Sequence, residues 1–203
     1  MKEDLRRMIS PDERIMWEGK PDKKCFIFEA IFNPLLPFAL IWALIDFSIL
    51  GVSIFDSSGN FLLFMIPFFA LHLMPVWMYL FGVLLSVKKY NNTYYIVTDR
   101  SIYVSTGVIS KSILSKPFAE MSHIDLHRGF FDQRFGVGDV ICTSNQVGVN
   151  GVSGLINISS IGNYTDVYNL VKKLQQDIYS DIMYPNDKRP SENHGYNTEY
   201  KGM

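Results

Sequence analysis

The sequence predicts a two-helix transmembrane hairpin followed by a small mainly-β barrel or sandwich that a C-terminal α-helix caps. The first observation behind this fold class is a very apolar stretch from Phe26 to Val87, interrupted by one short polar break. The second is a series of short β-prone runs after Tyr90 that ends in an amphipathic helix. The mean hydropathy of +0.09 hides this division, because an apolar third of the chain is averaged with a polar remainder.

Each half of the apolar stretch is long enough to cross the hydrocarbon core of a bilayer, which takes about 20 helical residues. Within residues 26–89 we expect transmembrane helices over about 28–55 and 61–87, joined by the polar break at 56–60. Pro67 and Pro75 lie inside the second segment and predict kinks there.

Positive charge flanks only the outer ends of this hairpin. Lys20, Lys23 and Lys24 precede the first segment, Lys88 and Lys89 follow the second, and the connecting loop contains no lysine or arginine. Because loops rich in lysine and arginine stay in the cytoplasm, both termini are predicted to be cytoplasmic. Residues 1–25 are then expected to form a cytoplasmic segment that packs near the membrane.

Composition excludes several classes of protein. A formal net charge of −1 argues against a nucleic-acid partner, which would require a large excess of lysine and arginine. Cys25 and Cys142 lie far apart and form no C-x-x-C pair, so we expect no disulfide framework, no metal site and no cofactor. At 203 residues, the chain has room for one modest domain beside the hairpin.

Residues 90–182 have the pattern of a β domain. β-branched and aromatic residues recur in short runs separated by turn residues, and the region ends in a helix with an apolar stripe of 3.6-residue period. Residues 183–203 are polar and are expected to be disordered. The expected strands are 93–98, 101–105, 108–114, 121–126, 139–144 and 154–159, and the stripe comprises Val167, Leu170, Val171, Leu174, Ile178 and Ile182.

Three stretches carry a resemblance to a known family. They are DERIMWEGKP at 12–21, YIVTDRSIYVSTG at 95–107 and GFFDQRFGVGDV at 129–140. Together with the hairpin they resemble the bacterial pleckstrin-homology-like (PH-like) domains of the membrane-flanked, YdbS-like type. The resemblance implies a PH-like split barrel of about seven strands, capped by the last helix and held at the cytoplasmic face of a bacterial cell membrane. It implies no shared catalytic motif or ligand.

The leading functional hypothesis is a non-enzymatic, membrane-anchored domain that binds a lipid, a peptide or a protein. The expected partners are membrane lipids together with a protein partner or a second copy of the chain. The alternative is a scaffold or accessory subunit that assembles through its hairpin. Residues proposed to form a basic patch facing anionic lipid or a partner are Lys111, Lys116, Arg128 and Arg134, for which scattered surface solubility is the competing interpretation.

Two ionisable residues lie within the predicted spans. Asp46 and His72 are at similar depths on antiparallel helices, counted from the connecting loop. A polar group in hydrocarbon usually faces a partner, so the two are predicted either to pair with each other or to contact another subunit or interfacial water.

Two further patterns allow more than one interpretation. His123, Asp125 and His127 alternate along a predicted strand and share one face, which is either a hydrated surface, the interpretation we favour, or part of a metal site. Phe130, Phe131 and Phe135 are expected to form a local core cluster, with insertion into the membrane interface as the alternative. Residues 136–138 read Gly-Val-Gly and predict a tight turn rather than a phosphate loop.

Overall fold

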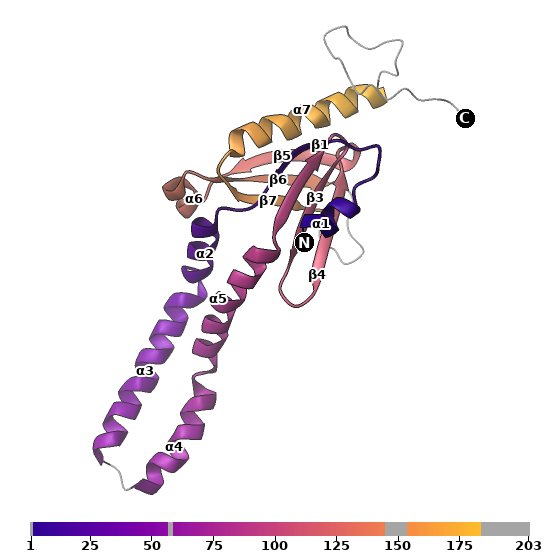
Figure 1. Ribbon diagram of the computed structural model, residues 1–203. Helices are drawn as coiled ribbons and strands as arrows, with labels where there is room; N and C mark the ends of the chain where they lie inside the picture. The colour runs from indigo at the N-terminus through magenta and orange to yellow at the C-terminus, as the bar shows by residue number, and fades with distance from the viewer. Residues whose placement is uncertain (1, 57–58, 145–153, 184–203) are drawn as a thin grey trace.

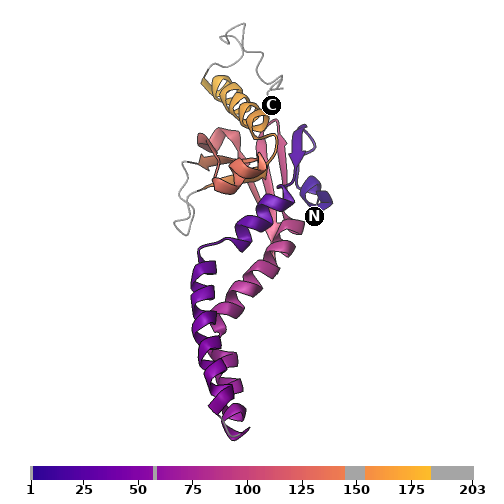
Figure 2. The same ribbon diagram turned by 90° about the vertical axis from the view of Figure 1, so that its left-hand side faces the viewer.

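A long helical hairpin projects from a β domain in the computed structural model, which describes residues 2–56, 59–144 and 154–183. Figure 2 shows from a second side that the hairpin extends away from the two sheets and from the final helix. The tail predicted to be disordered lies outside the described residues from 184 onward.

Four helices build the hairpin, where we expected two, the second of them kinked at Pro67 and Pro75. A bend of 46° separates the first pair and one of 53° separates the second. Asn33 explains the first bend, because its side chain accepts a hydrogen bond from Leu35 N and donates one to Ala30 O, and Pro34 follows. Pro75 lies in the first turn of the last helix, where a missing N–H does no harm. The helices are α2 (Lys23–Ile31), α3 (Leu35–Asp56), α4 (Gly59–His72) and α5 (Met74–Asn92).

No helix in the described part of the chain is by itself long and apolar enough to cross a membrane. Two bent pairs meet the requirements of length and composition when each is taken together. These pairs are Lys23–Ile31 with Leu35–Gly51, and Met65–His72 with Met74–Asn92.

Two antiparallel sheets form the domain, one of four strands in the order β1-β2-β3-β4 and one of three in the order β5-β6-β7. The first strand comes from the N-terminal segment: Ile15 pairs with Thr98 and Gly19 with Tyr95. The domain expected over 90–182 therefore also contains residues 15–19, which sequence spacing alone did not attach to it. The strands are β1 (Ile15–Gly19), β2 (Tyr94–Thr98), β3 (Ser101–Gly107), β4 (Lys111–Pro117), β5 (Met121–His127), β6 (Gly138–Ser144) and β7 (Ile156–Ile161).

The N-terminal segment is held to the outer face of the four-stranded sheet. Leu5, on α1 (Lys2–Arg7), is fully buried against Tyr94, Ile96 and Tyr103. The side chains of Lys2 and Arg6 both donate to the Glu18 carboxylate on β1. This segment, which we expected to pack near the membrane, is thus part of the folded domain.

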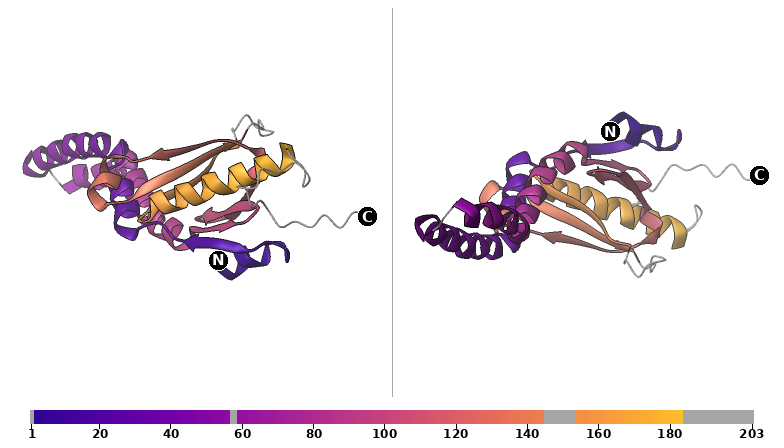
Figure 3. Two further views of the ribbon diagram at one scale, coloured as in Figure 1. Left: turned by 90° about the horizontal axis from the view of Figure 1, so that it is seen from above. Right: turned by 90° about the horizontal axis from the view of Figure 1, so that it is seen from below.

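The core lies between the two sheets, under α7 (Tyr164–Met183), as the views from above and below show (Figure 3). Val167, Val171 and Leu174 of the predicted stripe are buried there. Ile182, at the far end of the stripe, is 60% exposed because α7 extends past the sheets. Two antiparallel sheets and a C-terminal helix fit a PH-like fold, as the resemblance implied. The short helices are η1 (Phe118–Glu120) and α6 (Phe130–Phe135).

The buried thiol of Cys142 predicts an alkaline loss of stability. Burial raises its pKa from 9.0 to about 12. Above pH 9 the unfolded chain therefore releases a proton that the folded chain retains, and the free energy of unfolding falls by about 1.4 kcal/mol per pH unit until the folded pKa is reached. The free energy of unfolding, measured between pH 8 and 12, should fall less steeply with pH in Cys142→Ala than in the native protein. The difference in slope should correspond to about one proton released on unfolding. Equal slopes for the two proteins would contradict the prediction.

Candidate functional site

The hairpin meets the domain where α2 packs on α6. The rings of Phe28 and Phe135 lie 5.3 Å apart, and those of Phe32 and Phe131 lie 5.5 Å apart. The expected core cluster of three phenylalanines is therefore wrong: two of them join the hairpin to the domain, and Phe130 is 80% exposed.

Local capping fixes the position of Asp132 on α6. Its Oδ2 accepts a hydrogen bond from Gly129 N at 2.8 Å, which closes the first turn of the helix. Gly136 ends the helix with a φ of 70°, a left-handed conformation that glycine adopts without steric cost. The predicted tight turn at 136–138 is confirmed, and the buried Asp132 carboxylate is left facing α2.

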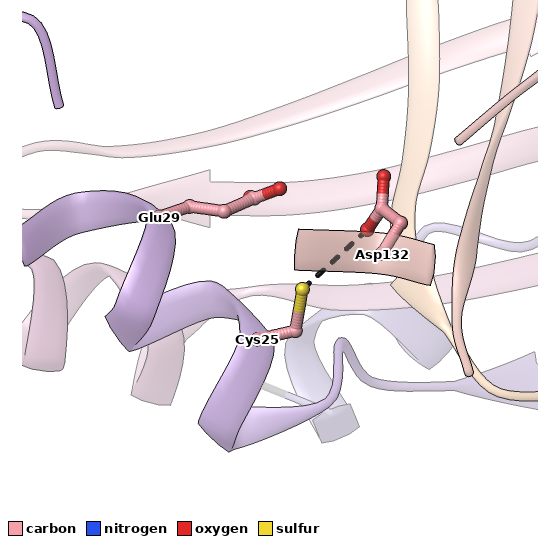
Figure 4. A group of neighbouring side chains, drawn as sticks. All are labelled: Cys25, Glu29 and Asp132. Carbon is pink, nitrogen blue, oxygen red and sulfur yellow. Dashed lines mark hydrogen bonds between the residues drawn. The ribbon is translucent and has the colours of Figure 1, made fainter. Parts of the chain in front are cut away.

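Two side chains of α2 converge on Asp132 (Figure 4). Cys25 and Glu29 are four residues apart and so share one helix face. The Cys25 thiol donates to Asp132 Oδ1 at 3.4 Å, and its backbone N–H donates to Asp22 Oδ1, which caps α2. The ligand atoms of Cys25, Glu29 and Asp132 all lie within 4.8 Å of one another, which is close enough to share a metal ion.

A second triad contains the same Asp132. His127 ends β5 and is directly paired with Asp139 on β6, and the ligand atoms of these two and of Asp132 also lie within 4.8 Å of one another. Burial raises the pKa of the Asp139 carboxyl, the hydrogen bond from Ser160 N lowers it, and the neighbouring Asp132 carboxylate raises it again. The junction thus concentrates carboxylates in a partly dry environment.

An irregularity in β7 borders this site. The pairing of β6 with β7 shifts register between Gly138 and Val140, and Ser160 opposite has a φ of 54°, which is uncommon for a residue other than glycine. This conformation directs Ser160 N to Asp139 Oδ1 at 2.7 Å and lets Ser160 O accept from Asp22 N at 2.6 Å. Ser160 therefore ties the cap of α2 to the carboxylate of β6.

Of the three alternating residues of β5, His123, Asp125 and His127, only one belongs to either triad. His123 and Asp125 are exposed and belong to neither group, whereas His127 belongs to the second. No sequence motif marks the remaining members of the two triads as ligands, namely Cys25, Glu29, Asp132 and Asp139. The four-residue spacing of Cys25 and Glu29 was the one local signal, and only the packing of α2 on α6 gives it meaning.

Inside the hairpin, Asp46 on α3 and His72 at the end of α4 lie side by side. His72 Nδ1 is 2.9 Å from Asp46 Oδ1 and 3.1 Å from Oδ2, and Asp46 is 1% exposed. The His72 ring stacks between Trp42 and Phe68, with centroids 5.1 and 5.2 Å away. Trp42 Nε1 also donates to His72 O, so the bend between α4 and α5 is fastened to α3.

The four basic residues lie on different parts of the domain. Lys111 begins β4 and Lys116 lies near its other end, whereas Arg128 and Arg134 flank or belong to α6 beyond β5. Arg128 has a structural part: its Nε donates to Val137 O, and its guanidinium lies 4.7 Å from the Tyr164 ring centroid. The four therefore do not form a single continuous strand face.

Comparison with known proteins decides the family. The family model described as "Bacterial PH domain" matches residues 33–175. This chain belongs to the bacterial PH domain family. The match includes α3 to α5, strands β2 to β7 and most of α7, whereas α2 and strand β1 of this bacterial PH domain protein precede the matched region. Searches of curated proteins and of solved structures gave no significant match.

Proposed function

We propose that the chain is a membrane-anchored, non-enzymatic PH-like domain protein of the YdbS-like type, which holds its domain at the cytoplasmic face and contacts lipid headgroups there. The observation that carries this proposal is the surface of the hairpin. Large apolar side chains are exposed along its described length, for example Leu44 at 69% and Leu71 at 79%. A contiguous apolar surface of this kind indicates a membrane or a partner protein.

The ends of the hairpin support an orientation. Lys23, Lys24, Lys88 and Lys89 lie at its domain-side end, where cations favour the cytoplasmic headgroup region. The β domain would then sit on the cytoplasmic side.

Two exposed apolar side chains, each with a basic residue nearby, lie on the side of the domain nearest the hairpin. Figure 1 shows the β3–β4 turn and α6 both on the side from which the hairpin projects. Ile109 in this turn is 90% exposed and Phe130 at the start of α6 is 80% exposed. Lys111 and Arg134 accompany them, and each cation near an anionic surface contributes about 1 kcal/mol. This arrangement suits shallow insertion of two apolar side chains among headgroups.

The family supports a non-catalytic role, because PH domains are generally binding modules. Anchoring raises the effective concentration of the domain at the bilayer, so individually weak lipid or protein contacts suffice. Lys116 and Arg128, on other parts of the domain, are proposed to add to binding of a protein partner.

Environment-sensitive fluorophores on the full-length protein test the lipid contact. Labels on Ile109→Cys and Phe130→Cys, reconstituted in vesicles, should shift to shorter emission wavelengths when anionic lipid is included, because both tips enter the headgroup region. The native cysteines are buried, so the unsubstituted protein provides the blank. Ile182→Cys on α7 is the matched control and should not shift. Water-like emission at 109 and 130 in all vesicles would overturn the contact.

The scaffold function is the second candidate, favoured by the same exposed hairpin, which offers a surface to partner helices. Gly51 on α3 and Gly82 on α5 have open space where a Cβ would stand, so a neighbouring helix could approach closely there. Native mass spectrometry in mild detergent distinguishes the scaffold from the lipid-contacting anchor. A defined oligomer that dissociates in Gly82→Leu would favour the scaffold, and a monomer would favour the lipid-contacting anchor.

A further inference from the structure

We propose that Cys25, Glu29, His127 and Asp132 bind one divalent transition-metal ion, such as Zn²⁺, at the junction between the hairpin and the domain. This site shares no residue with the proposed lipid contact, although Asp132 lies on α6, two residues after Phe130. A bound ion would connect α2, α6 and the end of β5.

The geometry supplies the donors. Cys25, Glu29 and Asp132 form one group and His127, Asp132 and Asp139 another, each with ligand atoms within 4.8 Å of one another. Asp132 belongs to both groups, so its carboxylate links them, and we place the ion beside it. Asp139 already accepts the Ser160 N–H, and we assign it the part of orienting His127, its cross-strand partner.

An independent observation comes from unpaired polar atoms around the same place. Ser160 Oγ is fully buried, adjoins the Cys25 thiol, and has no hydrogen-bond partner among the described residues. Asn157 Oδ1 is likewise without a partner in the described part of the chain, and Asn157 lies beside Asp139. Buried polar atoms normally find a partner, so two unpaired atoms beside the carboxylates point to a missing ligand with its bound water.

Charge points to a cation. The carboxylates of Asp132 and Asp139 and the imidazole of His127 all act electrostatically on Glu29. Three carboxylates in one partly buried place repel one another unless protons or a metal ion intervene. A cation therefore stabilises the arrangement that the fold imposes.

The donor set selects the class of metal. One sulfur, one imidazole nitrogen and carboxylate oxygens suit Zn²⁺ and related first-row ions in tetrahedral geometry, whereas Mg²⁺ and Ca²⁺ prefer oxygen ligands alone. On binding, the Cys25 S–H bond breaks, an S–metal bond forms, and the proton leaves to solvent, with no change in oxidation state. The hydrogen bond to Asp132 Oδ1 is exchanged for metal ligation.

Cobalt binding by full-length protein in detergent tests the site, because Co²⁺ bound to thiolate gives a charge-transfer absorption band. After treatment with a chelator, the protein should take up one Co²⁺ per chain with this band. Zn²⁺ should displace the cobalt, and Mg²⁺ and Ca²⁺ should not. Cys25→Ser should abolish the band, and Glu29→Gln should weaken binding at least about tenfold.

Matched controls separate this site from adventitious binding. Cys142→Ser changes the other buried thiol, and His123→Ala changes a neighbouring exposed imidazole on β5; both should leave the uptake and the band unchanged. Glu29 is exposed, so Glu29→Gln should keep the native circular dichroism even if Cys25→Ser unfolds. The proposal is overturned by absence of stoichiometric uptake, or by uptake that Cys25→Ser and Glu29→Gln leave intact.

Discussion

Lysine at positions 44 and 71 is expected to abolish stable integration of the hairpin into membranes. Leu44 on α3 and Leu71 on α4 are among the most exposed apolar side chains of the described hairpin, at 69% and 79%. In water such replacements would be harmless or would improve solubility. In a bilayer, each lysine near the centre of a span costs about 2.5–3.5 kcal/mol. The sign of the effect therefore distinguishes a membrane environment from an aqueous one.

The measurement is the fraction of Leu44→Lys, Leu71→Lys and the double variant that resists alkaline extraction from membranes. We expect a partial loss for each single variant and nearly complete loss for the double variant. Ile182→Lys, at an exposed apolar position on α7, is the matched control and should remain like the native protein. Retention of all three hairpin variants in the membrane pellet would contradict the anchor.

Removing the His72 imidazole is expected to destabilise the hairpin on the order of 3 kcal/mol, because it leaves the Asp46 carboxylate buried without its partner. Their contact at 2.9 Å lies at the bend between α4 and α5, where Trp42 also holds His72 O. Asp46→Asn should cost less than His72→Ala, since an amide retains hydrogen-bonding capacity without a charge. The double variant should cost less than the sum of the two single ones.

The native protein, the two single variants and the double variant form a double-mutant cycle. Their free energies of unfolding can be measured in mixed micelles with increasing amounts of a denaturing detergent. Ser48→Ala is the control: Ser48 lies on the same helix, and its hydroxyl bonds only to Leu44 O among the described residues, so the change should cost little. Additive effects of Asp46→Asn and His72→Ala would show that the two side chains do not stabilise each other.

Local patterns identified the elements of the domain well. Alternation of β-branched and aromatic residues marked the strands, and the 3.6-residue stripe from Val167 to Ile178 marked α7 together with the face it buries. Predictions of this kind succeed because the backbone geometry of a strand or helix directly sets how often a side chain returns to the same face. The Gly136 turn was equally local, since a left-handed residue after a short helix calls for glycine.

Predictions that depended on long-range packing fared differently. The bend beside Pro75 agrees with the kink that this proline predicted, but the bend after α2, where Asn33 and Pro34 lie, was not expected from the apolar length. Phe131 and Phe135 were assigned to a core because aromatic residues are usually buried, whereas α2 supplies their partners from about a hundred residues away in sequence. Strand β1 likewise joins β2 across the whole hairpin.

By itself, the sequence determined the division of this protein into an apolar hairpin and a β domain closed by a helix, because composition and periodicity are properties of neighbouring residues. Tertiary structure decided which ionisable side chains meet. Cys25 and Glu29 share a helix face through local spacing, yet Asp132, His127 and Asp139 reach them only when α2 packs on α6 and β5 pairs with β6. Contacts between distant segments depend on packing, which no local pattern encodes.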